Sequence, residues 1–209
     1  MLRASPRMFD SGLLDFFSRV HPAIPALIFL PVIVVLTVIG LSEVSALAFV
    51  GLFAGGYLMW TLFEYWLHRI VFHFEPEAGI GARLHWIIHG VHHDHPNDPM
   101  RLVMPPAVSV PLGVIIIGLF YLILGGRYAP ALGAGFVTGY LVYDMTHYYL
   151  HHFTPRGPLG RALRELHMRH HFQDDTRGFG ISAPYWDVIF RTLPRRGQRA
   201  PADRAPDAH

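Results

Sequence analysis

Four apolar stretches separated by short polar or glycine-rich breaks dominate the sequence. They cover residues 24–41, 46–65, 107–124 and 130–143. A helix needs about 20 apolar residues to cross the ~30 Å hydrocarbon core of a bilayer, and the first two stretches approach that length. Residues 42–45 separate the first pair and residues 125–129 the second pair, so each pair can form a hairpin. The pattern predicts an all-α integral membrane protein with four transmembrane helices in two hairpins.

The fourth stretch is shorter than the others and rich in glycine. Small residues let membrane helices approach each other closely. This stretch is therefore expected either to pack tightly against a neighbouring helix or to be only partly inserted.

Residues 1–20 carry a different pattern. Asp10, Asp15 and Arg19 interrupt the apolar residues, so the segment does not resemble a signal peptide. After an N-cap at Asp10, a helix would place on one face the apolar residues Leu13, Leu14, Phe16, Phe17 and Val20. This pattern predicts a short interfacial helix on the membrane surface, with a frayed terminus as the alternative.

Two polar segments, residues 64–106 and 144–194, are rich in histidine, arginine and aromatic residues. They follow the two hairpins and are expected to fold together as a cytoplasmic helical cap on the membrane helices. Residues 1–194 then form a single domain, and the polar residues 195–209 form a disordered tail.

Composition and charge support the membrane assignment. Hydrophobic residues make up 52% of the chain and charged residues 15%, with a mean hydropathy of +0.31. The chain has no cysteine, which excludes disulfides, zinc–thiolate sites and iron–sulfur clusters. No basic run has the form of a nucleic-acid-binding segment, so no nucleic acid partner is expected.

Arginine predicts the orientation of the chain. All 17 basic residues are arginine, and nearly all lie before the first apolar stretch, between the second and third, or after the fourth. The positive-inside rule then places both termini and both polar segments in the cytoplasm. The absence of lysine is typical of a GC-rich gene, which favours a bacterial cytoplasmic membrane.

The histidines are strongly clustered. Residues 85–96 read HWIIHGVHHDHP, and five of these twelve residues are histidine. The spacing i, i+3, i+4 within this run recurs downstream and puts three rings on one helical face. His68 and His73 are five apart, a spacing that does not align on a straight helix, so one of the two rings must sit where the helix ends or bends. The four clusters contain His68, His73, His89, His92, His93, His147, His151, His167, His170 and His171.

Clustered imidazoles indicate a metal centre. Imidazole is the commonest side-chain metal ligand, and a metal ion takes four to six ligands, so ten imidazoles fit two metals. Each ligand also needs an acceptor for its second ring nitrogen, or another polar neighbour. Candidates for this supporting role are Glu64, Asp144, His85 and His152. A lone histidine is more often a core or surface residue, and His21 and His209 are interpreted that way.

The order of these motifs resembles a known family. HRIVFH, HGVHH, HYYLHH and HMRHH, set around two hairpins, are similar to the fatty acid hydroxylase/sterol desaturase superfamily of membrane di-iron enzymes. RLVMPP at 101–106 and GFGIS at 178–182, followed by Trp186 and Asp187, resemble the fatty acid 2-hydroxylase branch. The resemblance covers residues 64–192.

The resemblance implies an O2-dependent di-iron enzyme that 2-hydroxylates a long-chain fatty acid or acyl lipid. Two iron ions would be the cofactors, although zinc binds imidazole more tightly and can occupy such sites in purified protein. Arg101 and Tyr143 are candidate head-group contacts. The sequence has no haem signature, cysteine or dinucleotide fingerprint, so a separate electron donor, cytochrome b5-like or ferredoxin-like, is expected.

Two other functions remain open. A lipid desaturase or a sterol or carotenoid hydroxylase could use the same scaffold. A membrane metal carrier or sensor is the alternative from another class, but it should place its ligands near the bilayer midplane rather than at one end of the helices.

Overall fold

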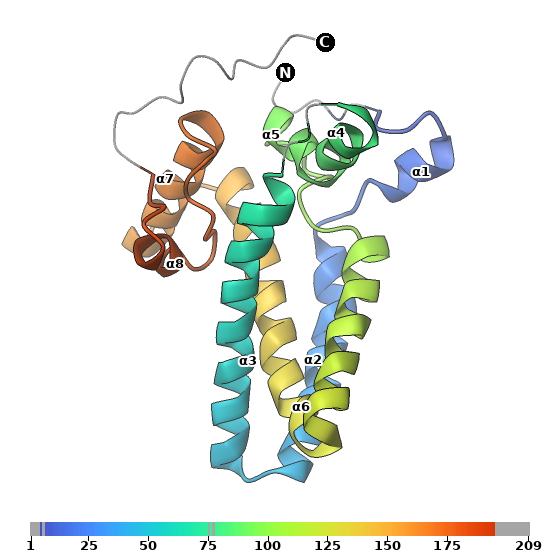
Figure 1. Ribbon diagram of the computed structural model, residues 1–209, viewed down its shortest axis with the longest axis vertical. Coiled ribbons are helices and arrows are strands. Elements are labelled where there is room, and N and C mark those ends of the chain that lie inside the picture. The colour runs from blue at the N-terminus through green and yellow to red at the C-terminus, as the bar shows by residue number, and fades with distance from the viewer. Residues whose placement is uncertain (1–4, 6, 75, 77, 195–209) are drawn as a thin grey trace.

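The computed structural model describes residues 5, 7–74, 76 and 78–194, and within them every regular element is helical. Three long helices, α2 (Ala23–Glu43), α3 (Ala46–Trp66) and α6 (Pro106–His152), form a stem (Figure 1). The shorter helices gather at one end of this stem as a head, which holds the polar segments. They are α1 (Gly12–Phe17), α4 (Gly79–His85), α5 (Val91–Asp94), α7 (Pro158–Phe172) and α8 (Tyr185–Ile189), with π-helical turns η1 (Leu67–Phe72) and η2 (Trp86–Gly90).

Among the residues that the structure describes, three helical segments are long and apolar enough to cross a membrane: Ala23–Glu43, Ala46–Phe72 and Pro106–His152. The third has 47 residues and would be about 70 Å long if it were straight. It instead folds back at Gly125, whose φ of 70° is outside the helical region and favours glycine (Figure 1). The reversal is sharper than the predicted turn over residues 125–129, because helical structure resumes at Gly126.

The second arm of α6, residues 126–152, packs against α3 with the two backbones nearly in contact. A Cβ atom built on Gly135 would lie 1.9 Å from the carbonyl oxygen of Phe53, and one on Gly56 would lie 2.0 Å from that of Leu132. These positions accept only glycine without movement of a helix. The prediction that the glycine-rich stretch packs tightly against a neighbour is therefore confirmed.

Aromatic side chains fill the interface near the head. The Trp60 ring makes edge-to-face contacts with Phe136 and Tyr140, each at a centroid distance of 5.2 Å. Such pairs add about 0.5–1.5 kcal/mol beyond the burial of their surface. The outer faces of the stem are also apolar, and on α2 Leu27, Val34 and Val38 are each at least 60% exposed. Apolar residues all round a helix suit a lipid environment.

The N-terminal helix α1 differs in detail from the sequence prediction. Its N-cap is Ser11 rather than Asp10, because the Ser11 side chain accepts from the amide of Leu14. Phe16 and Phe17 are more than half exposed, whereas Val20 is buried and lies beyond the end of the helix, so it is not part of the predicted apolar face. The predicted disordered tail, 195–209, lies outside the described residues.

Candidate metal centre

The first histidine pair is brought together by a π-helical turn. At the head end of α3 the helix widens into η1, and the amide of His73 bonds to the carbonyl of His68, 3.2 Å away. This i to i+5 pattern replaces the usual i to i+4 pattern and turns residues five apart toward the same side. Their Nε2 atoms are consequently 3.2 Å apart. The expectation that one of the two imidazoles sits where the helix ends or bends is confirmed, because His73 is the C-cap of η1.

The remaining clusters lie on three further segments of the head end. His89 is in the second π-helical turn, η2, and His92 and His93 follow in α5. His147 and His151 occupy the last turns of α6, which thus extends well past the apolar stretch. The last cluster, HMRHH, lies in the C-terminal half of α7.

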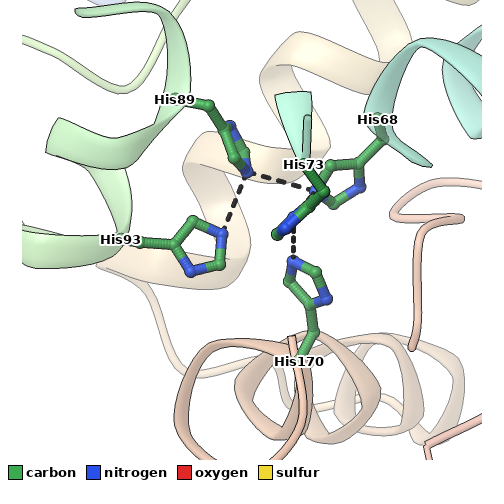
Figure 2. A group of neighbouring side chains, drawn as sticks. All are labelled: His68, His73, His89, His93 and His170. Carbon is green, nitrogen blue, oxygen red and sulfur yellow. Dashed lines mark hydrogen bonds between the residues drawn. The ribbon is translucent and has the colours of Figure 1, made fainter. Parts of the chain in front are cut away.

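All ten predicted histidines converge, in two groups of five. In each group the ring nitrogens lie within 4.8 Å of one another. Figure 2 shows the first group, whose rings point from three segments toward a common centre. The first group is His68, His73, His89, His93 and His170, and the second group is His92, His147, His151, His167 and His171.

Neighbouring residues supply different groups. His92 belongs to the second group and His93 to the first, and the same division separates His171 from His170. Successive side chains on a helix point about 100° apart, so a helix running between two sites can serve both. The two groups are in contact, because the rings of His93 and His171 stack at a centroid distance of 4.2 Å.

The spacing of the ring nitrogens suits a bound metal ion. The Nε2 atom of His93 is 2.9 Å from that of His89, and the Nε2 atom of His92 is 3.0 Å from those of His147 and His171. Two nitrogens about 2.1 Å from one ion and at right angles to each other would lie about 3.0 Å apart. A neutral imidazole carries a proton on only one of its two ring nitrogens. Five Nε2 atoms that face one another therefore cannot all be paired by hydrogen bonds, and their lone pairs suit a bound cation better.

Burial keeps these imidazoles neutral. It lowers the pKa of His73 to about 2, helped by nearby histidines, and lowers the pKa of His170 to about 4, although the Arg177 carbonyl opposes it. Burial also lowers the pKa of His171 well below its ordinary value. A neutral ring offers a lone pair to a metal, whereas a protonated ring does not.

Backbone carbonyls orient two of the rings. His68 Nδ1 lies 2.8 Å from the carbonyl oxygen of Phe179, and His170 Nδ1 lies 2.7 Å from that of Arg177. A proton on Nδ1 donates to each carbonyl, which leaves the Nε2 lone pair facing the centre of the group.

The carboxylates predicted to take this role have other partners. Glu64 accepts from the amide of Ser182 at 2.8 Å and from its hydroxyl, and Asp144 accepts from the amide of Met104 at 3.2 Å. Each lies about one helical turn deeper in the stem than the histidine it was expected to orient. These hydrogen bonds therefore anchor loops of the head to the stem, and a role for the two carboxylates in orienting histidines stays a prediction.

The other two supporting candidates lie outside both groups. His85 is half-buried at the C-terminal end of α4. The ring of His152 packs on Tyr148 at a centroid distance of 4.3 Å.

Asp187 has a structural role that the sequence did not reveal. This buried carboxylate accepts from the amides of Phe179 and Gly180, at 3.0 and 2.8 Å, and from the hydroxyl of Thr192 at 2.7 Å. It thereby holds the loop whose Phe179 carbonyl faces His68. The residue was part of the motif that carried the resemblance, but its spacing gave no sign of these partners.

An apolar cavity of about 300 Å³ reaches both groups of histidines. His89 from the first group and His92 and His147 from the second form one wall. Tyr143, a candidate head-group contact, also lines the cavity, and its ring stacks on His147 at a centroid distance of 5.9 Å. The other walls come from the N-terminal segment, the loop before α6 and the start of α6, and include Met8, Phe9, Leu14, Phe17, Leu102, Val103, Met104, Ala107 and Val108.

Arg101 lines the same cavity but is held by carboxylates. Its guanidinium lies 2.9 Å from Asp15 and 3.8 Å from Asp98, and its side chain is 3% exposed. A buried guanidinium needs such partners to offset the loss of its hydration. Arg101 therefore ties the N-terminal segment to the loop before α6, which accounts for its charge without a lipid head group.

Comparison with known proteins agrees with this geometry. The family model described as fatty acid hydroxylase matches residues 53–192. The dihydroceramide fatty acyl 2-hydroxylase FAH2 of Arabidopsis thaliana is 41% identical over 191 residues, which cover 90% of this chain and 80% of that protein. The fatty acid 2-hydroxylase of Rattus norvegicus is 45% identical over 152 residues, 69% of this chain and 40% of that protein.

A solved structure of full-length scs7p, in which only the hydroxylase domain is visible, superposes with a TM-score of 0.85 and 34% identity. The match covers 90% of this chain and 72% of that chain. The sequence match spans more than half of the chain and includes all ten converging histidines. The chain therefore belongs to the fatty acid hydroxylase family.

Proposed function

We propose that this protein is a membrane hydroxylase that places a hydroxyl group on carbon 2 of a long fatty acyl chain. The observation that carries the proposal is the apolar cavity whose wall includes histidines of both groups. The relatives named above are, by their names, 2-hydroxylases of fatty acids or of dihydroceramide acyl chains.

The two groups of five histidines would each hold one iron ion. Bound iron, with O2 as co-substrate, supplies the oxidising power that an unactivated C–H bond requires and that acid–base side chains lack. The overall reaction consumes the substrate C–H, O2, two electrons and two protons, and it yields the alcohol and water. Zinc would occupy the same nitrogens without redox chemistry.

The chain's own residues position the substrate. The apolar walls would hold the acyl chain and exclude water, and Tyr143 would pack beside the carbon that faces His147. Small errors in such placement cost large factors in rate. The N-terminal segment contributes Met8 and Phe17 to the same cavity, which supports treating residues 1–194 as one domain.

Expression of the protein in a host without 2-hydroxylated lipids is expected to produce fatty acids with a hydroxyl on carbon 2. Mass spectrometry of released fatty acids, compared with cells carrying the empty vector, measures this product. A new double bond, or a hydroxyl on a sterol or carotenoid ring, would contradict the proposal and favour the alternative reactions. Metal accumulation without any lipid product would favour a carrier or sensor.

We further propose four membrane spans, with the two arms of α6 as the third and fourth and the head in the cytoplasm. The distribution of arginines supports this orientation. The named relatives are eukaryotic, so a bacterial membrane remains a prediction from the lysine-free composition.

Because the chain has no cysteine, single cysteines report topology cleanly. Glu43→Cys, at the end of α2, and Arg156→Cys, in the head, replace exposed residues at opposite ends of the stem. An impermeant maleimide is expected to label Glu43→Cys in intact cells and Arg156→Cys only after the membrane is opened. Labelling of both in intact cells would contradict the four-span arrangement, and the reverse pattern would invert the orientation.

A further inference from the structure

The outer face of α7 carries an open groove of about 590 Å³. The same helix supplies three histidines to the two groups, so the groove and the metal centre lie on opposite sides of one helix. Arg161, Arg164 and Arg169 line the groove, together with Met168 and Phe172. Nothing in the positioning of the acyl chain uses this surface.

The groove is positively charged. Three arginines line it, whereas Glu165 is the one acidic residue among the described residues that line it, and it pairs with Arg169. Exposed Arg156, just before α7, adds to the positive charge of this side of the head. A partner that fits by charge complementarity is therefore acidic.

An aromatic ring connects the groove to the metal centre. Phe172 is 57% exposed in the groove, and its ring centroid lies 6.0 Å from that of His171. His171 belongs to the second group of histidines. Electron transfer slows steeply with distance, so a donor seated over Phe172 would be separated from a proposed metal ligand by a single ring.

The position of the groove also leaves the substrate side free. Figure 1 shows α7 on one side of the head and α1, which borders the acyl cavity, on the other. A protein bound at α7 would not cover the cavity.

From these features we infer that the outer groove of α7 docks a small acidic redox protein. Bound there, it would deliver electrons past Phe172 and His171 to the iron ion that the second group would hold. The inference rests on the proposed hydroxylation, which consumes two electrons for each O2. The chain has no cysteine for an iron–sulfur cluster and no dinucleotide fingerprint, so these electrons come from a partner. Anionic lipid head groups would also satisfy the arginines, but they would give no role to the exposed ring beside His171.

The test compares two electron sources with the purified, iron-loaded protein in lipid nanodiscs. One source is dithionite, and the other is an acidic protein donor with its reductase, either a [2Fe–2S] ferredoxin or the soluble haem domain of cytochrome b5. Arg156→Glu combined with Arg161→Glu reverses charge at the groove, and Arg83→Glu on α4 is the matched exposed control. Phe172→Leu removes the ring, and Phe172→Tyr retains it.

The groove variant is expected to weaken binding of the acidic donor, measured by surface plasmon resonance, and to lower donor-driven 2-hydroxylation, each at least about tenfold. Added salt is expected to weaken both in the parent protein. The rate of dithionite-driven 2-hydroxylation should be unchanged in the groove variant. The Arg83→Glu variant should keep the parent protein's rate with both electron sources. Phe172→Leu should slow transfer at saturating donor without changing donor affinity, and Phe172→Tyr should restore it.

Three results would overturn the docking site while leaving the proposed function intact. The first is an unchanged donor-driven rate in the groove variant. The second is that dithionite supports product formation but neither acidic donor does. The third is that the groove variant loses activity equally with both electron sources, and only in nanodiscs of anionic lipid. The last result would assign the groove to lipid. Absence of product even with dithionite would instead contradict the proposed function itself.

Discussion

Replacing His92 with alanine is expected to lower 2-hydroxylation at least about a hundredfold and to remove one metal ion from the protein. His92 is buried, and its Nε2 atom lies 3.0 Å from the Nε2 atoms of both His147 and His171. It therefore occupies the middle of the second group. Loss of residues that merely support a ligand typically costs 10–100-fold, so loss of a central ligand should cost no less.

The neighbouring residue provides a sharp comparison. His93 belongs to the first group, so His93→Ala should also lose one metal ion, but from the other site. Metal analysis of the purified protein is expected to give about two ions per chain for the parent protein, about one for each single variant and almost none for the double variant. His21→Ala changes an exposed histidine that belongs to neither group and should retain both metal ions and full activity.

Two outcomes would contradict this assignment. Retention of two metal ions and of activity in His92→Ala would show that the second group is not a metal site. Loss of both metal ions in each single variant, with the helical content of the parent protein, would show that the groups form one site rather than two.

Helical periodicity predicted which histidines form the site but not how they divide between two groups. The i, i+3, i+4 spacing placed the rings of two of the four clusters on one helical face, and all ten predicted histidines converge. The division into two groups depends on how α5 and α7 lie between the sites, which is a tertiary property. The acceptors for His68 and His170 are backbone carbonyls, and a carbonyl has no signature in the sequence.

The fold shows the same limit. Apolar stretches predicted the stem helices, because burial in lipid requires continuous apolar faces. The reversal at Gly125 was correctly located but predicted too long, since one glycine with positive φ replaces a five-residue turn. Contacts between segments far apart in the sequence could not be predicted. One of them is the ion pair of Asp15 with Arg101, which brings the N-terminal segment against the cavity.

Gly135→Ala is expected to destabilise the stem by more than about 3 kcal/mol and to prevent assembly of the metal centre. Ordinary overpacking of a core costs about 1–3 kcal/mol, because side chains can shift. Here the added methyl group would lie 1.9 Å from the carbonyl oxygen of Phe53, so the backbones of α3 and α6 must separate.

The matched control is Gly118→Ala in the first arm of α6, where an added Cβ has no neighbour within 4 Å. Alanine favours helix over glycine, so this variant should be as stable as the parent protein or slightly more stable. Thermal unfolding in detergent, followed by circular dichroism, measures both variants. Since α3 leads into His68 and α6 carries His147, separation of the two helices should also disperse both histidine groups and reduce bound metal. If the Gly135→Ala protein unfolds at the same temperature as the control and binds two metal ions, the backbones of α3 and α6 do not approach each other this closely.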